Sequence, residues 1–124
     1  MTEVIDMKPV FVNALKSVTE LKSTRTNYPK DWKSVQFPMA IYRASKKPHY
    51  LEQGYDEWQT YWTVVIELYA NNGSLTSIKN SLLESFAQIG FTGKWKDGNT
   101  AGLKRIEIEL KAIVDNNLKT IYRA

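Results

Sequence analysis

The sequence predicts an α+β fold, in which an antiparallel sheet of four or five strands carries two helices packed on one face. Two periodicities support this prediction. Apolar side chains alternate with other side chains over residues 59–70 and 103–114, as in strands. Over residues 75–89 apolar side chains recur every three or four positions, as in a helix. With the remaining segments the order of elements is α-β-β-α-β-β, and residues 119–123 add a short last strand.

Length and composition indicate one domain spanning residues 1–124. The chain has 124 residues, of which 43% are hydrophobic and 12% aromatic, enough for a single core. Its apolar runs are far shorter than the roughly 20 residues that cross a bilayer. Its N-terminus, MTEVIDMKP, has acidic residues where a signal peptide needs basic ones, so we expect a protein that stays in the cytoplasm of the cell that makes it. Without cysteine, stability must come from packing or assembly.

The first half of the chain reads as a helix, a loop and a strand. Residues 7–22 place apolar side chains on one stripe of a helix. Residues 23–34 are rich in Ser, Thr, Asn and Pro, which favours a loop. Alternation returns over residues 36–44, where Pro38 cannot donate to a strand ladder and so indicates an edge or a strand start.

A long polar segment follows at residues 45–57. It contains Pro48 and Gly54 and is too long for a two-residue turn, so we expect a protruding loop or ribbon between two antiparallel strands. Aromatic side chains are favoured as interface anchors. The side chains that we expect to make contacts from this segment are Tyr50, Leu51 and Tyr55. The alternative is that the first two fold back on their own sheet.

The strand at residues 59–70 raises the question of what covers its second side. Its first row is wholly apolar and reads as core: Trp62, Val64, Ile66 and Leu68. Its second row carries one charge only: Tyr61, Thr63, Val65, Glu67 and Tyr69. A strand that faced water on this side would carry more charge. The cover is either a neighbouring subunit or the loop that contains Tyr28 and Trp32.

The second half of the chain begins with a helix at residues 75–89, for which Ser74 is a favourable N-cap and Gly90 a favourable C-cap. The glycines of residues 91–102 predict a short strand or hairpin arm. Over residues 103–114 apolar side chains face one way and charged side chains the other, which indicates a strand with one buried face.

The search for chemistry finds no catalytic, cofactor-binding or metal-binding set. His49 is the only histidine and no cysteine accompanies it, so it lacks partners for a metal site or a nucleophile. No glycine-rich phosphate loop is present in the sequence. Glu107 and Glu109 share one strand face. Basic residues on either side of the pair, Arg105 and Lys111, favour an exposed salt-linked ladder over acid–base catalysis. We expect a protein that acts by binding and is not an enzyme.

Four segments, in this order, resemble landmarks of the tail terminator and tail-completion proteins of long-tailed bacteriophages. They are a proline-containing strand FPMAIYR after the first helix, an aromatic-rich strand YWTVVIELYA after a long polar loop, a helix ending LLESFAQIGF, and a charged alternating strand KRIEIELKAIV. The resemblance spans nearly the whole chain and lies in order and landmarks rather than in a strict motif.

The resemblance implies a structural role in the virion, at the junction of tail and head. Such proteins form a homo-hexameric ring on the finished tail tube, stop further addition of tube protein and offer a surface to head-completion proteins. The implied partners are copies of this chain, the tube protein and a head-completion protein. No cofactor, membrane or specific nucleic acid is implied, although DNA can pass through the ring. The side chains expected at the subunit or tube interface are Tyr50, Leu51, Tyr55, Tyr61, Val65 and Tyr69.

Two other functions stay open. A head–tail adaptor or neck protein occupies the other side of the same junction and has similar size and composition. A small nucleic-acid-binding domain would instead use an aromatic and basic platform. Its residues would be Trp95, Lys94, Lys96 and Lys104. The net charge of +4 is low for such a domain, and the basic residues are scattered.

Overall fold

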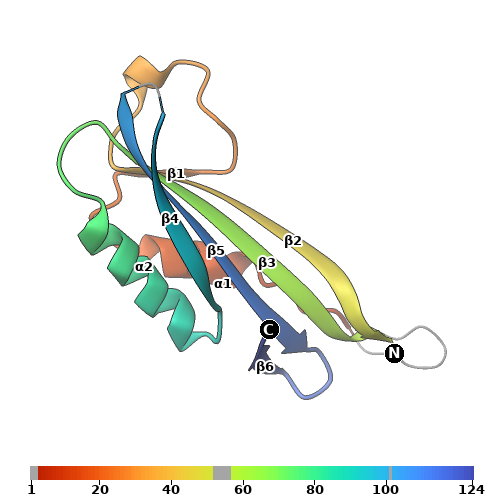
Figure 1. The fold of residues 1–124 in the computed structure, drawn as a ribbon. Coiled ribbons are helices and arrows are strands. Elements are labelled where there is room, and N and C mark those ends of the chain that lie inside the picture. The colour runs from red at the N-terminus through yellow and green to blue at the C-terminus, as the bar shows by residue number, and fades with distance from the viewer. Residues whose placement is uncertain (1–2, 52–56, 101) are drawn as a thin grey trace.

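The computed structural model describes residues 3–51, 57–100 and 102–124. Within these residues it shows a six-stranded sheet and two α-helices (Figure 1). The predicted α+β class is confirmed, and buried residues of both helices join one face of the sheet in a single core. The sheet has more strands than the four or five predicted, because a three-residue strand lies within the segment predicted as a loop.

In chain order the elements are α1 (Lys8–Lys16), β1 (Ser23–Arg25), the short 3₁₀ helix η1 (Trp32–Ser34), β2 (Met39–Leu51), β3 (Glu57–Ala70), α2 (Thr76–Gln88), β4 (Thr92–Thr100), β5 (Leu103–Asp115) and β6 (Thr120–Arg123). The strand order in the sheet is β1-β2-β3-β5-β4, and β6 pairs with the end of β5. β1 runs parallel to β2, and the other pairs are antiparallel. β6 confirms the last strand predicted at residues 119–123.

The core lies between the helices and the inner face of the sheet. The predicted apolar rows of β3 and β5 both point into it and are buried: Trp62, Val64, Ile66 and Leu68, and Ile106, Ile108, Leu110 and Ala112. The ring centroid of Phe11 in α1 lies 5.6 Å from that of Trp62, 6.0 Å from Phe86 of α2 and 5.0 Å from Phe91. These aromatic contacts bind both helices to the same sheet face.

The first helix is shorter than the prediction of residues 7–22. Helical pairing ends at Lys16, where the Ser17 hydroxyl donates to the Ala14 carbonyl at 2.6 Å. A serine hydroxyl that bonds to nearby backbone offers the chain an alternative to the helix. Val18 stays buried against the core, which explains why the apolar spacing continues past the end of the helix.

The second helix agrees with the prediction to within one residue at each end. It begins at Thr76, and the Ser74 hydroxyl accepts a hydrogen bond from the Thr76 amide at 3.1 Å although Ser74 is not itself the N-cap residue. Gly90 has a φ of +89°, and its amide donates to the Ala87 carbonyl at 3.0 Å. The prediction that this glycine ends the helix is confirmed.

The described part of the segment at residues 45–57 is a ribbon of paired strands. The prediction that the strand before it ends at residue 44 is wrong, because β2 continues to Leu51 and pairs with β3, with register shifts after Pro48. β2 starts directly after the Phe37–Pro38 bond, as expected of a proline at a strand start. This half of β2 consists mostly of polar residues and shows little alternation. The buried apolar row of the strand pair comes from β3. In Figure 1 the ribbon extends past the helices.

Candidate interaction surface

The outer face of the sheet, opposite the helices, has a covered half and an open half. On β3 the second row is buried at one end, where Glu67 is 3% exposed and Tyr69 is 2% exposed. Along the same row Val65, Thr63 and Tyr61 are partly exposed. Within the described part of the chain, the outer face of β3 is therefore covered at one end only.

The covered half lies beneath residues 26–38, which we call the strap. The strap joins β1 to β2, and the ring of Trp32 meets that of Tyr69 edge-on with 5.1 Å between centroids. The loop predicted as a cover is thus the cover for this half. Tyr69, predicted as an interface residue, is enclosed by its own chain, which removes it from any contact with a neighbour. The small second core under the strap is formed by Met39, Ile41 and Tyr69, with Trp32, Val35, Phe37 and Leu103 packed against it.

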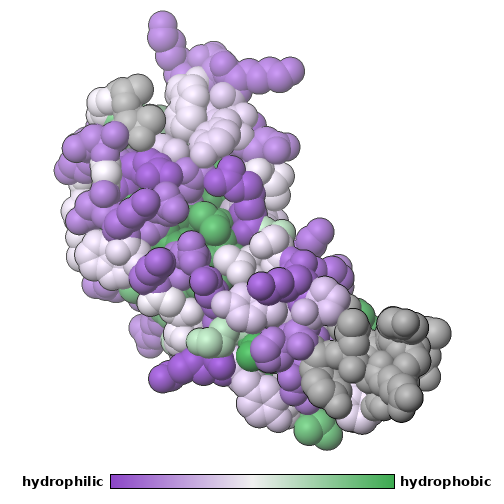
Figure 2. Space-filling model, turned by 45° about the vertical axis from the view of Figure 1, so that its right-hand side comes forward, coloured by the Kyte–Doolittle hydropathy of each residue, from purple (hydrophilic) through white to green (hydrophobic). Residues whose placement is uncertain are grey.

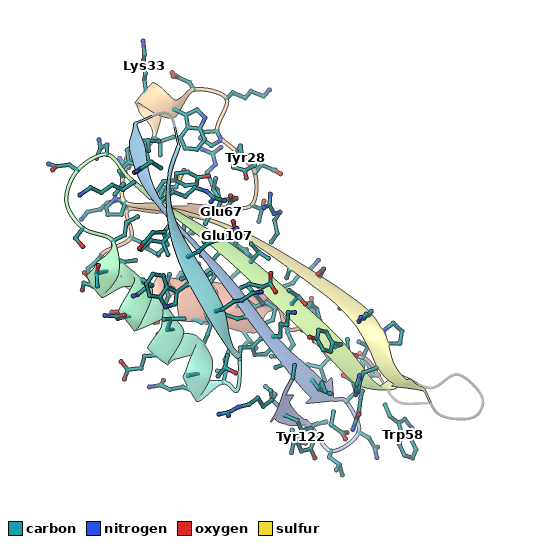
Figure 3. All side chains as sticks on the ribbon, viewed as in Figure 1. Tyr28, Lys33, Trp58, Glu67, Glu107 and Tyr122 are labelled. Atoms are coloured by element: carbon teal, nitrogen blue, oxygen red, sulfur yellow. The ribbon has the colours of Figure 1, made fainter. Side chains whose placement is uncertain are left out.

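An ionic network fastens the strap to the sheet (Figure 3). The Tyr28 hydroxyl donates to the Glu67 carboxylate and lies 2.7 Å and 2.9 Å from its two oxygens. Arg43 of β2 donates to the same carboxylate at 3.3 Å, and Arg105 of β5 forms an ion pair with it. Arg105 also donates to Glu107 at 2.9 Å. Three strands and the strap therefore meet at Glu67.

The electrostatics of this network favour an ionised Glu67. Burial on its own would raise the pKa of the Glu67 carboxyl, but the hydrogen bonds from Arg105 and Tyr28 and the arginine charges together lower that pKa below its ordinary value. The bond to Glu67 in turn raises the pKa of Arg105. Burial raises the pKa of Tyr69. Glu67 thus acts as a charged anchor for the strap rather than as a proton donor.

The open half of the outer face, which we call the open face, combines aromatic, aliphatic and basic side chains. The strand register places Tyr61 opposite Ile113, and Ile113 opposite Tyr122 of β6. Tyr122 is 45% exposed. The residues of the open face are Arg43, Lys47, Tyr61, Thr63, Val65, Lys111, Ile113 and Tyr122.

Charged side chains frame the open face. The Lys47 ammonium lies 5.2 Å from the ring centroid of Tyr61, within the range of a cation–π contact. On β5, Glu109 pairs with Lys111 at 3.2 Å, and Glu107 pairs with Arg105 in the network under the strap. The salt links predicted for the two glutamates are confirmed, but the ladder is partly buried rather than exposed, with Glu107 26% and Glu109 30% exposed.

The remaining predicted interface residues lie in two places. Tyr61 and Val65 belong to the open face. Tyr50 and Leu51 are the last two residues of β2, three and four positions after Lys47 of the open face. Tyr55 lies outside the described residues. Of the predicted set, the structure therefore places Tyr61 and Val65 on the open face and Tyr69 under the strap.

The described residues hold no group of three or more His, Cys, Asp or Glu placed to bind a metal ion. His49 is exposed on β2, with its ring centroid 6.3 Å from that of Tyr61. In the ranges that the structure describes, neither helix is long and apolar enough to cross a membrane.

The four residues considered for nucleic-acid binding do not share one surface. Trp95 faces the helix side of β4, where Lys79 of α2 places its ammonium 3.6 Å from the ring centroid. Lys94 and Lys96 point to the opposite side, across from two glutamates of β5. Lys104 donates to a backbone carbonyl in the turn between β3 and α2 at 2.6 Å.

Sequence reasoning missed the network around Glu67. The available signal was a single charge in an otherwise uncharged strand row, which indicates a buried and paired carboxylate. Its partners Tyr28, Arg43 and Arg105 come from three distant segments, so the sequence alone could not assign them.

Comparison with known proteins gives no family for this chain. Neither a scan against models of known protein families nor a search of curated proteins finds a match.

Proposed function

We propose that this protein is a tail terminator of a long-tailed bacteriophage, which forms a homo-hexameric ring on the tail tube, stops its polymerisation and presents a surface for head attachment. It is then a structural component of the virion at the tail–head junction. Its partners are copies of itself, the tube protein and a head-completion protein. The resemblance of four successive segments to such proteins supports this role, and the element order of the fold is compatible with it.

The open face is the observation that carries the proposal. Under the strap, the same outer row is buried by aromatic and aliphatic side chains of its own chain. Beyond the strap, Tyr61 and Val65 stay partly exposed beside the exposed Tyr122. A second copy placed over these side chains would continue the cover that the strap provides. Tyrosine is enriched in protein interfaces, and its amphipathic ring tolerates water before assembly.

The polarity of the surface suits subunits that exist alone before they assemble. Figure 2 shows a side of the molecule on which hydrophilic side chains predominate and hydrophobic areas are small. Interfaces of such subunits are about as polar as the rest of their surface. In a ring, one patch of each copy binds a different patch of the next copy. Such an assembly closes when the rotations from copy to copy add up to a full circle.

The variant Tyr61→Asp tests the proposal, because it places a charge at the centre of the open face. Negative-stain microscopy and sedimentation, alone and with tail tubes, should show rings for the unmodified protein and none for a folded Tyr61→Asp variant. Leu118→Asp is the matched control: Leu118 is 63% exposed in the turn before β6, and its variant should assemble normally.

Several outcomes contradict the proposal. Unmodified protein that stays monomeric at every concentration, with tubes present, rules out a ring. Binding to head-completion protein without binding to tubes identifies the head–tail adaptor instead. Oligonucleotide affinity that falls steeply with salt identifies a nucleic-acid-binding domain.

A further inference from the structure

One edge of the sheet is open over most of its length. On one side β2 pairs with β3, and on the other it pairs with β1, a pairing that ends at Ile41. Among the described residues, no further strand pairs with β2 on that side. In Figure 1 β2 accordingly forms the outer edge of the sheet along the ribbon. We call this side of residues 42–49 the open edge. Backbone groups that face such an edge form a template for an added strand.

The side chains along the open edge are basic. The sequence of residues 42–49 is YRASKKPH, which contains no acidic residue. Its three arginine and lysine side chains, Arg43, Lys46 and Lys47, are all exposed. A partner strand beside β2 would therefore meet positive charge along its length.

The two lysines project from opposite sides of the sheet. The strand register places Lys46 across from Trp62 of the buried row, and Lys47 across from Tyr61 of the outer row. The ammonium groups lie 5.4 Å and 5.2 Å from the centroids of these two rings. Neither lysine forms a salt bridge with another described residue. No acidic side chain in the described part of the chain therefore neutralises them.

We propose that the open edge binds an extended acidic segment of another protein, which adds to the sheet as a strand beside β2. The backbone of this segment pairs with residues 42–47, and its carboxylates face Lys46 and Lys47. Pro48 has no amide to donate, so the template ends there. The added strand lies in the plane of the sheet and leaves the open face free. This contact is therefore separate from the self-association of the proposed function.

The charge of the open edge opposes pairing with a second copy of the chain. Like charges on neighbouring strands are destabilising, and lysine on an edge strand protects against edge-to-edge association. The strand at the other edge of the sheet, β4, carries Lys94 and Lys96 and would bring further positive charge. An acidic partner gains from the same charges that repel a second copy.

Nucleic acid, the other anionic class of partner, fits the open edge less well. Proteins that bind single strands use aromatic faces on which the bases stack. The ring beside Lys46 belongs to Trp62, which is 1% exposed, and the ring beside Lys47 belongs to Tyr61, which already holds that lysine. The unpaired backbone, in contrast, supplies the hydrogen-bonding groups that a peptide strand requires.

Two short labelled peptides test the proposal by fluorescence anisotropy. The probe peptide alternates glutamate with valine and threonine. The comparison peptide has the same sequence with methyl groups on its central backbone nitrogens, which keep the charges but prevent strand pairing. The probe peptide should bind saturably, and the methylated peptide should bind roughly tenfold more weakly or not at all, because it cannot donate to β2.

Charge variants locate the contact. Lys46→Glu/Lys47→Glu should weaken binding of the probe peptide by roughly tenfold or more, since it reverses the charge on both sides of the open edge. Lys94→Glu/Lys96→Glu is the matched control, because it makes the same change at two exposed positions of the other edge strand and should leave the affinity nearly unchanged. Circular dichroism confirms that both variants fold.

Hydrogen exchange gives a readout on the natural protein, without any substitution. In the free protein, the amides of residues 42–47 that face the open edge should exchange quickly, because no strand covers them. The probe peptide should slow their exchange and leave the amides of β4 unchanged.

Several results would overturn strand addition at the open edge. They are the absence of saturable binding, equal binding of the methylated peptide, equal losses in the two double variants, and unchanged exchange at residues 42–47. A single-stranded oligonucleotide that binds where the peptide does not, and that Lys46→Glu/Lys47→Glu releases, identifies a nucleic-acid surface instead. Microscopy of the unmodified protein with tail tubes needs no added peptide, so the proposed ring is tested independently.

Discussion

The Tyr28 hydroxyl lies within 2.9 Å of both carboxylate oxygens of Glu67, 39 positions later in the sequence. This contact joins the first part of the strap to the central strand of the sheet. Because Arg43 and Arg105 hold the same carboxylate, Glu67 is bound from two strands and from the strap. The network therefore fixes where the covered half of the outer face ends and where the open face begins.

The variant Glu67→Gln should lower the free energy of unfolding by about 2–4 kcal/mol, because it leaves the charge of Arg105 without its buried partner. Urea denaturation measures the change. Glu109→Gln is the matched control on the same sheet face, where the ion pair with Lys111 is partly exposed and its loss should cost less than about 1 kcal/mol. Equal losses of unfolding free energy in the two variants would show that burial does not strengthen the ion pairs of Glu67.

The stability that Glu67 contributes should depend on pH in a defined direction. Its pKa in the folded protein is lowered relative to the ordinary value of about 4.3 that applies in the unfolded chain. The unfolded chain then binds the proton more tightly, so the contribution is complete above the unfolded pKa and is lost as the pH falls through the lower, folded pKa. The difference in Tm between the natural protein and Glu67→Gln should be largest near pH 7 and shrink below about pH 4. A constant difference across this range would mean that Glu67 is not ionised.

The variant Tyr28→Phe should loosen the strap while leaving the main core intact. It removes one hydrogen bond to a charged acceptor from a half-exposed side chain, which should cost about 1–2 kcal/mol. Limited trypsin digestion should cleave after Lys30 or Lys33 faster than in the natural protein, since both lie in the strap. Tyr122→Phe, at an exposed tyrosine outside the strap, should leave the cleavage rate unchanged.

The parts of the fold that the sequence predicts best are those with strong periodicity of their own. β3 and β5 each bury one apolar row, and α2 buries one apolar stripe. The spacing of these residues therefore predicts both that the elements form and which side of each is buried. β1 has three residues, too few to show alternation, and it exists because it pairs with the start of β2. The polar second half of β2 likewise depends on its pairing with β3, which no local pattern reports.

The cover of the outer face shows why the site was harder to predict than the fold. The row from Tyr61 to Tyr69 indicates that something covers it, and the sequence offers both the strap and a neighbouring subunit. Trp32 reaches Tyr69 only after the chain folds back over the sheet, so the choice depends on tertiary structure. In the structure the strap covers one end of the row and leaves the other end open. The sequence leaves the strap and a neighbouring subunit as alternatives for the whole row, so it does not predict this division.

The variant Gly90→Ala should destabilise the protein by about 2–4 kcal/mol through two separable effects. The backbone at Gly90 has a φ of +89°, a conformation that costs an L-residue about 1–2 kcal/mol. The new Cβ would also lie 2.7 Å from Cγ2 of Ile121, so β6 would have to move away from the end of α2. Gly73→Ala isolates the first effect, because Gly73 has a φ of +80° and an added Cβ there meets nothing within 4 Å. Urea denaturation of both variants gives the difference. A larger loss at Gly90 establishes that the end of α2 and β6 are held together at this contact, whereas equal losses would mean that Ile121 moves aside without cost and that β6 is not fixed there.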